Sequence, residues 1–108
     1  MTMAVAITQQ NFEKEIVQET KPIVLDVYAT WCGPCQQMTP IFAELEKEIG
    51  NTYKFAKLNV DEARELSIKY GVTSVPTFIF IKNNEVKGKE TGYMGKEDLQ
   101  EKIEELLG

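Results

Sequence analysis

Residues 31–35 read Trp31-Cys32-Gly33-Pro34-Cys35, and they separate two segments of different character. Before them, Ile23–Tyr28 is a largely β-branched run without alternation, which is typical of a strand buried on both faces. After them, apolar residues recur at helical spacing as far as Ile49, which predicts a helix. The two cysteines are therefore expected at a strand-to-helix junction, and the rest of the fold is built around that junction.

Strands and helices are expected to alternate along the remainder of the chain. The pattern predicts a first strand over Met3–Ile7 and a helix over about Gln9–Gln18 that Thr8 caps. It then predicts a strand over Tyr53–Val60, a helix capped by Asp61 that runs through Tyr70, a hairpin of strands Thr77–Lys82 and Glu85–Thr91 with Asn83-Asn84 at its turn, and a last helix over about Lys96–Leu107. Such alternation implies parallel strands with helices on both faces, and the hairpin adds an antiparallel edge. We therefore predict a single α/β domain over residues 1–108, with three α/β/α layers, a central mixed five-stranded sheet and four helices.

The composition argues against several classes of function. The net charge is −5 and the basic residues are scattered, so no basic stripe is available to bind nucleic acid. No apolar run approaches the ~20 residues that span a bilayer, and residues 1–10 lack the positive charge of a secretory signal, so we expect a cytoplasmic protein with no membrane association. With two cysteines and no histidine, neither a four-ligand zinc site nor an imidazole base is expected, and we predict no metal.

The spacing of the two cysteines points to redox chemistry. A Cys-x-x-Cys motif in a βαβ setting is a redox signature, because the first turn of a helix brings the two sulfurs within bonding reach. Pro34 suits the first helical position, where its missing N–H costs nothing. Cys32 would then lie at the positive end of the helix dipole, which favours its thiolate. Two alternatives remain: the cysteines are small buried hydrophobes, or they are half of a metal site shared between chains.

The sequence resembles the thioredoxin family. Residues 31–35 match the family's active-site motif, and the resemblance extends over nearly the whole chain, at Asp26, Pro40, Lys57–Asp61, Tyr70–Val72, Val75–Thr77 and Gly92. The resemblance implies a thioredoxin fold and a thiol–disulfide oxidoreductase that reduces disulfides in target proteins. Cys32 would be the nucleophile that forms a mixed disulfide, and Cys35 would resolve it. The only redox group would be the reversible Cys32–Cys35 disulfide, recycled by a separate thioredoxin reductase, and we expect a monomer with no other cofactor.

Asp26 interrupts an otherwise apolar strand. One reading is a strand with one face in water, but the apolar neighbours on both sides favour a desolvated carboxyl group with a raised pKa. That makes Asp26 a candidate proton acceptor for Cys35, which is the role that the resemblance assigns to it. Lys57 alone would be an ordinary strand lysine that reaches solvent, whereas the resemblance implies that it lies near Asp26 and modulates it.

The substrate-binding surface is expected beside the cysteines. Trp31 is predicted to be partly exposed as a contact for substrate, the alternative being a core tryptophan. Pro76 opens a strand, and the resemblance implies a cis Val75–Pro76 bond facing the disulfide. The groove is predicted to include Val75, Pro76, Thr77 and Gly92, with residues 73–75 and 92–94 along its border. Gly33 and Pro34 would help to set the redox poise on the reductant side.

Two other functions stay open on the sequence alone. The same chemistry serves a disulfide oxidase or isomerase, which a reduction potential would distinguish from a reductant. The groove could also belong to a redox-independent binding or assembly subunit, whose binding would survive replacement of both cysteines by serine.

Overall fold

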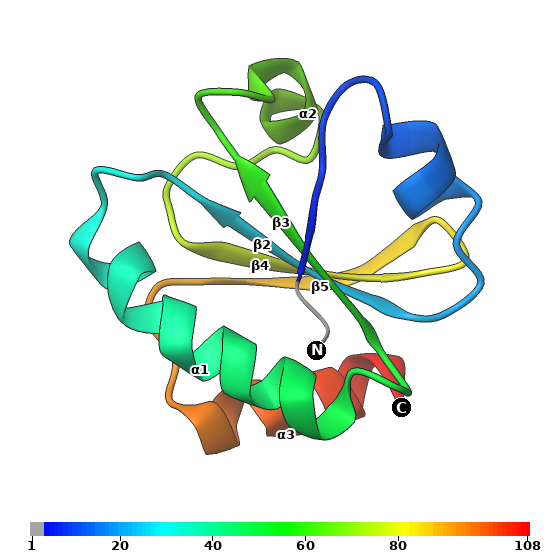
Figure 1. The fold of residues 1–108 in the computed structure, drawn as a ribbon, viewed down its shortest axis with the longest axis vertical. Coiled ribbons are helices and arrows are strands. Elements are labelled where there is room, and N and C mark those ends of the chain that lie inside the picture. Colours follow the sequence, from blue (N-terminus) through cyan, green and yellow to red (C-terminus); the bar gives the residue numbers. More distant parts are fainter. Residues whose placement is uncertain (1–3) are drawn as a thin grey trace.

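The computed structural model describes residues 4–108 and contains five strands and four helical segments (Figure 1). The strands are β1 (Val5–Ala6), β2 (Ile23–Tyr28), β3 (Lys54–Asn59), β4 (Thr77–Lys82) and β5 (Glu85–Thr91). The helices are η1 (Glu13–Val17), α1 (Gly33–Ile49), α2 (Arg64–Lys69) and α3 (Lys96–Leu107). Met3, with which the predicted first strand begins, lies outside the described residues.

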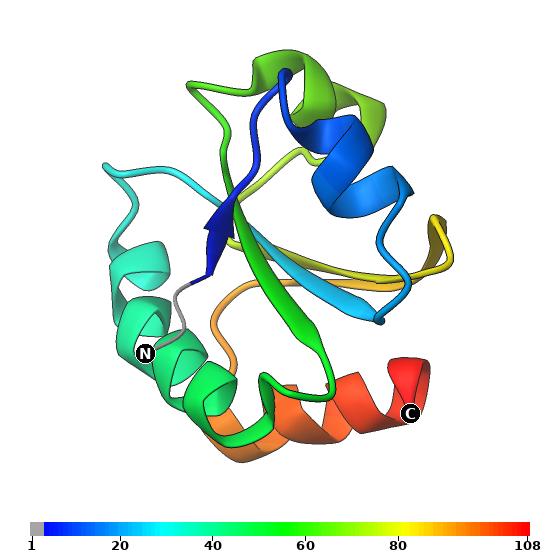
Figure 2. The same cartoon turned by 45° about the vertical axis from the view of Figure 1, so that its right-hand side comes forward.

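The strands form one mixed sheet in the order β1-β3-β2-β4-β5. β3 runs parallel to both β1 and β2, whereas β4 is antiparallel to its neighbours β2 and β5. Helices α1 and α3 cover one face of the sheet, and η1 and α2 cover the other (Figures 1 and 2). The predicted fold class is confirmed, with β2 at the centre of the sheet. Within residues 4–108, no helix is long and apolar enough to cross a membrane.

Side chains of β2 alternate between two apolar clusters, one on each face of the sheet. On the side of η1 and α2, Leu25 and Val27 pack in a cluster that includes Ile16 and Leu66. On the side of α1 and α3, Val24 packs in a cluster with the following residues: Met38, Phe42, Phe78, Leu99 and Ile103. Both faces of β2 are therefore buried, as the unbroken apolar run predicts.

The first helix is shorter than the sequence predicts and has a different hydrogen-bond pattern. η1 is a π-helical turn in which the Gln18 N–H donates to the Glu13 carbonyl, and the residues before it form turns. Thr8 and Asn11 bond reciprocally, since each side chain accepts from the other's backbone N–H. The Asn11 amide also donates to the Ala6 carbonyl. Thr8 therefore caps the turns that lead into η1, as the sequence predicts, and its carbonyl accepts the Phe12 N–H over 3.0 Å.

The start of α2 also differs from the prediction, and Asp61 is not its cap. The helix begins at Arg64, and the N-cap residue Ala63 has no side chain that could accept a hydrogen bond. The Asn59 side chain accepts the Asp61 N–H at 2.9 Å, which holds the chain in turns beyond β3. The Asp61 carboxylate is therefore free to accept a hydrogen bond from outside α2.

Candidate active site

Cys32 and Cys35 lie where β2 leads into α1, and they form a disulfide. Their Cα atoms are 5.2 Å apart, and Cys32 is the N-cap residue of α1. The Cys35 N–H donates to the Cys32 sulfur over 3.2 Å. Because α1 begins at Gly33, Pro34 occupies the second helical position, one residue later than predicted. The disulfide rules out the reading of two inert buried thiols.

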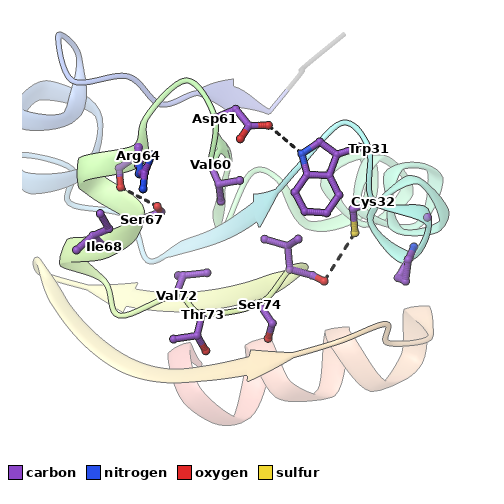
Figure 3. Close-up of a pocket in the computed structure, with 13 residues that line it drawn as sticks. Trp31, Cys32, Val60, Asp61, Arg64, Ser67, Ile68, Val72, Thr73 and Ser74 are labelled. Atoms are coloured by element: carbon purple, nitrogen blue, oxygen red, sulfur yellow. Dashed lines mark hydrogen bonds between the residues drawn. The ribbon is translucent and has the colours of Figure 1, made fainter.

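The surroundings of Cys32 favour a negative charge on its sulfur once the disulfide is reduced. The Cys35 N–H already points at that sulfur, and the N-terminal end of α1 adds the positive end of the helix dipole. The sulfur also lies 3.7 Å from the carbonyl oxygen of Val75, which precedes a cis peptide bond to Pro76 (Figure 3). Within residues 4–108, no group of three or more acidic or cysteine side chains is placed to hold a metal ion.

Asp26 is buried, so the reading of a strand with one wet face is wrong. Only 2% of the residue is exposed, and among residues 4–108 its Oδ1 atom finds no hydrogen-bond partner. Burial raises the pKa of the Asp26 carboxyl to about 7, and the positive charge of Lys57 opposes that rise. The carboxyl group can therefore exchange a proton near neutral pH.

Lys57 stands beside Asp26 in the sheet. The two residues are register partners on β2 and β3, so their side chains project from the same face. The Lys57 amino group lies 4.6 Å from the centre of the Tyr28 ring, a cation–π arrangement. A charged lysine is thus held near the buried carboxyl group by an aromatic ring.

Asp26 lies on the same side of the sheet as the second cysteine. Side chains two apart on a strand share a face, so Asp26 projects with Val24 toward α1. Val24 packs in the cluster that holds Met38, and Cys35 is buried one helical turn before Met38 on α1. The buried carboxyl group and the buried sulfur therefore belong to the same interface between β2 and α1.

Trp31 is on the surface, and the alternative of a core tryptophan is wrong. The residue is 70% exposed, and its indole Nε1–H donates to Asp61 Oδ2 over 3.0 Å. Asp61 thus orients the tryptophan instead of capping α2 (Figure 3).

An open groove of about 780 Å³ runs from the cysteines to α2 (Figure 3). Of the predicted site residues, Trp31, Cys32, Gly33, Pro34 and Val75 line it. Thr73 and Ser74 line it as well, so the predicted border at residues 73–75 is present.

Pro76, Thr77 and Gly92, which were predicted for the substrate groove, are not among the residues that line this one. Pro76 is buried, and Thr77 is buried with its hydroxyl donating to the Ser74 carbonyl over 2.6 Å. The Gly92 N–H donates to the Pro76 carbonyl, and none of residues 92–94 is among the groove's lining. These bonds fix the loop before β4 on the side away from the groove, and the Val75 carbonyl of that loop faces Cys32.

The part of the groove formed by α2 was missed by sequence reasoning. Arg64, Ser67 and Ile68 line it, together with Val60 and Val72. One signal for it is present in the sequence: Ile68 lies two positions from the inward-facing Leu66, so one helix face cannot bury both.

Comparison with known proteins gives one consistent result. Residues 3–105 match the family model for thioredoxin. A thioredoxin of Rickettsia bellii is 39% identical over 94% of this chain and 96% of its own length. A thioredoxin of Bacillus subtilis is 39% identical over 95% of this chain and 97% of its own length. The chloroplastic thioredoxin M-type of Pisum sativum is 37% identical over 94% of this chain, which spans 59% of that relative.

Proposed function

The chain belongs to the thioredoxin family, and from that premise we propose that it reduces disulfide bonds of target proteins by dithiol–disulfide exchange at Cys32 and Cys35. Thiol–disulfide oxidoreductase chemistry follows from the family and from the bonded pair. The observation that carries the division of labour is the position of Cys32, which lines the groove at the start of α1, whereas Cys35 does not line it.

The reaction begins with both cysteines reduced. The Cys32 thiolate attacks one sulfur of a target disulfide, a Cys32–target bond forms, and the other target sulfur leaves as a thiolate. Cys35 then loses its proton and attacks the Cys32 sulfur, which releases the second target sulfur. The target gains two electrons and two protons in all, and the protein is left with the Cys32–Cys35 disulfide.

Asp26 is the proton acceptor for Cys35 in the second step, and Lys57 modulates it. A pKa of about 7 lets the carboxylate accept a proton at neutral pH and return it to solvent. The positive charge of Lys57 lowers the pKa of Asp26, so more of the carboxyl group is ionised and able to accept a proton. The shared interface between β2 and α1 supports this assignment.

Other residues of the site bind or position the target. Trp31 supplies contact area and Gly33 and Pro34 tune the redox poise, while the Val75 backbone faces an extended target segment. Pro76, Thr77 and Gly92 act through the loop that they hold, as positioning residues. We propose that residues 1–108 form one monomeric domain, that no cofactor is needed beyond the disulfide, and that neither nucleic acid nor membrane is a partner.

Electrons come from a separate thioredoxin reductase, because the chain needs an external donor to reopen its disulfide. The cytoplasm is the compartment that a reductant of this kind fits, since its thiols are kept reduced there. The pea relative, by contrast, is named as chloroplastic.

The reduction potential of the Cys32–Cys35 couple is the measurement that tests this function. We expect a value below that of the cytosolic glutathione pool, and about 30 mV corresponds to 1.4 kcal/mol for such a two-electron couple. A value well above the pool would assign the protein to the disulfide oxidases or isomerases. A double variant Cys32→Ser, Cys35→Ser tests the remaining alternative, because it cannot reduce a disulfide. If the variant still binds its partner and still supports the partner's assembly, the protein is a redox-independent assembly subunit.

A further inference from the structure

Ile68 is an apolar residue exposed in the wall of the groove. It is 64% exposed, whereas its neighbour Leu66 on α2 is 4% exposed and packs in the core. Because its side chain is mostly in water, Ile68 contributes little hydrophobic burial to the stability of the fold. Its place in the groove that starts at Cys32 suggests a role in contact with another molecule.

The surroundings of Ile68 have the composition of a binding surface. Val60 and Val72 add aliphatic side chains to the same groove, while Arg64 and Thr73 add polar groups. An apolar centre with a polar rim is the usual anatomy of a protein interface. In Figure 3, Ile68 and Val72 lie toward the end of the groove that is away from Trp31 and Cys32.

We propose that Ile68 and Val72 form a specificity subsite that binds one large apolar side chain of the target polypeptide, several residues away from the cysteine under attack. The inference rests on the proposed function and names which targets that function prefers. A segment whose cysteine is bonded to Cys32 and which runs extended along the groove reaches α2 without leaving the surface. The continuity of the groove from Cys32 to Ile68 is what ties the occupant to the target of the reaction.

The size of the effect follows from the shape of the site. The groove is open, so a leucine side chain of the target would be covered only in part by Ile68 and Val72. Partial burial of a leucine-sized group corresponds to about tenfold in kcat/KM. Since side chains of an extended segment alternate in direction, the preference should appear at alternate positions of the target and not at all of them.

Synthetic peptides test the subsite directly. Each peptide carries one cysteine joined in a disulfide to 5-thio-2-nitrobenzoate, and one leucine is moved from two to six residues on either side in an otherwise serine–glycine sequence. Attack by the Cys32 thiolate on the peptide sulfur releases the coloured thiolate, whose appearance gives the rate. The expected result is a rate about tenfold higher for the best leucine position than for the peptide without leucine.

Two variants connect that preference to α2. Ile68→Ser should abolish the preference, so that peptides with and without leucine react at the same rate, whereas Ile68→Leu should keep the preference. The matched control is Val86→Ser, because Val86 is 40% exposed on β5 and does not line the groove. This control should behave as the unmodified protein.

The possible failures can be told apart. If the unmodified protein reacts with all peptides at one rate, or if Ile68→Ser keeps the preference, the subsite does not exist while the proposed function stands. A reduced protein that releases thiolate from no peptide would overturn the proposed function itself. If Ile68→Ser alters only the oligomeric state measured by light scattering, the surface is a contact between two copies and the inference is wrong.

Discussion

Asp26 and Lys57 lie directly opposite each other on the parallel strands β2 and β3. The carboxyl group is buried and its pKa is raised to about 7, yet the nearest opposing charge is half-exposed beside the Tyr28 ring. The sheet therefore holds an acid that is costly to ionise, next to a cation that only partly compensates the cost.

Replacing Asp26 by Asn should stabilise the protein at alkaline pH. The pKa of Asp26 is higher in the folded state, about 7, than its ordinary value of 3.8. The folded state therefore binds more protons between these values, so the free energy of unfolding falls as pH rises from about 4 to 7 and then levels off. That gap corresponds to about 4 kcal/mol as an upper limit. Denaturant unfolding at pH 4 and pH 8 should show a gain for Asp26→Asn only at pH 8, and Asp61→Asn, at an exposed carboxylate, should show none.

The same substitution should slow the release of the target. Asparagine cannot accept the Cys35 proton, so decay of the mixed disulfide should slow by about 10²-fold, at the lower end of what general-base catalysis contributes. Stopped-flow kinetics of single turnovers separates this step from the first attack. An unchanged rate of decay would show that Cys35 loses its proton to another group.

Replacing Lys57 by Met should move the pH dependence upward. Without the lysine charge, the pKa of Asp26 rises further above 7, because burial is no longer opposed. The pH at which resolution of the mixed disulfide reaches half its maximal rate should rise with it. Lys47→Met is the control, since Lys47 is exposed on α1 and outside the groove. Equal pH profiles for the two variants would remove Lys57 from the mechanism.

Replacing Cys35 by Ser should trap target proteins covalently. The Cys32 thiolate still forms the mixed disulfide, and no second thiol resolves it. Incubation with an oxidised target should give a complex that survives denaturation and disappears on addition of a reductant. Cys32→Ser is the matched control and should trap little, because Cys35 is only 4% exposed. Stronger trapping by Cys32→Ser would reverse the assigned order of attack.

Replacing Asp61 by Leu should loosen Trp31. The indole loses its acceptor at 3.0 Å, so the 70% exposed ring gains freedom about its side-chain torsions. The chain has one tryptophan, so the fluorescence anisotropy of the whole protein reports on this ring and should fall. Asp61→Asn, which keeps an acceptor oxygen, should retain most of the anisotropy.

Elements with a strong local signal could be predicted from the sequence. The hairpin at Asn83 and Asn84 is an example, since both residues adopt the positive φ that such turns require. Burial of Asp26 could also be predicted, because apolar residues flank it on both sides. The fold and the cysteine pair followed from these local patterns together with the resemblance.

Features that depend on contacts between distant residues, or on a local change of hydrogen-bond pattern, could not be predicted. Thr8 caps the first helix as predicted, but Glu13–Val17 adopts a π-helical turn, and Asp61 accepts from Trp31, 30 positions away in the sequence, instead of capping α2. Burial of Pro76 and Thr77 next to Val75, which lines the groove, is another feature that the sequence alone does not show. The spacing of Leu66 and Ile68 indicates that one helix face cannot bury both, but only the packing of α2 on the sheet shows that Ile68 is the exposed one.

The strand that carries Asp26 leads directly into the loop of Cys32, and it is the middle strand of the sheet. Its amides are bonded to β3 on one side or β4 on the other, so they should exchange with deuterium more slowly than those of β1 or β5 at the edges. If β1 or β5 separates from the sheet, β2 stays paired with its neighbours, and the two cysteines that follow it keep their positions. The reactive pair is therefore attached to the strand that we expect to separate from the sheet last.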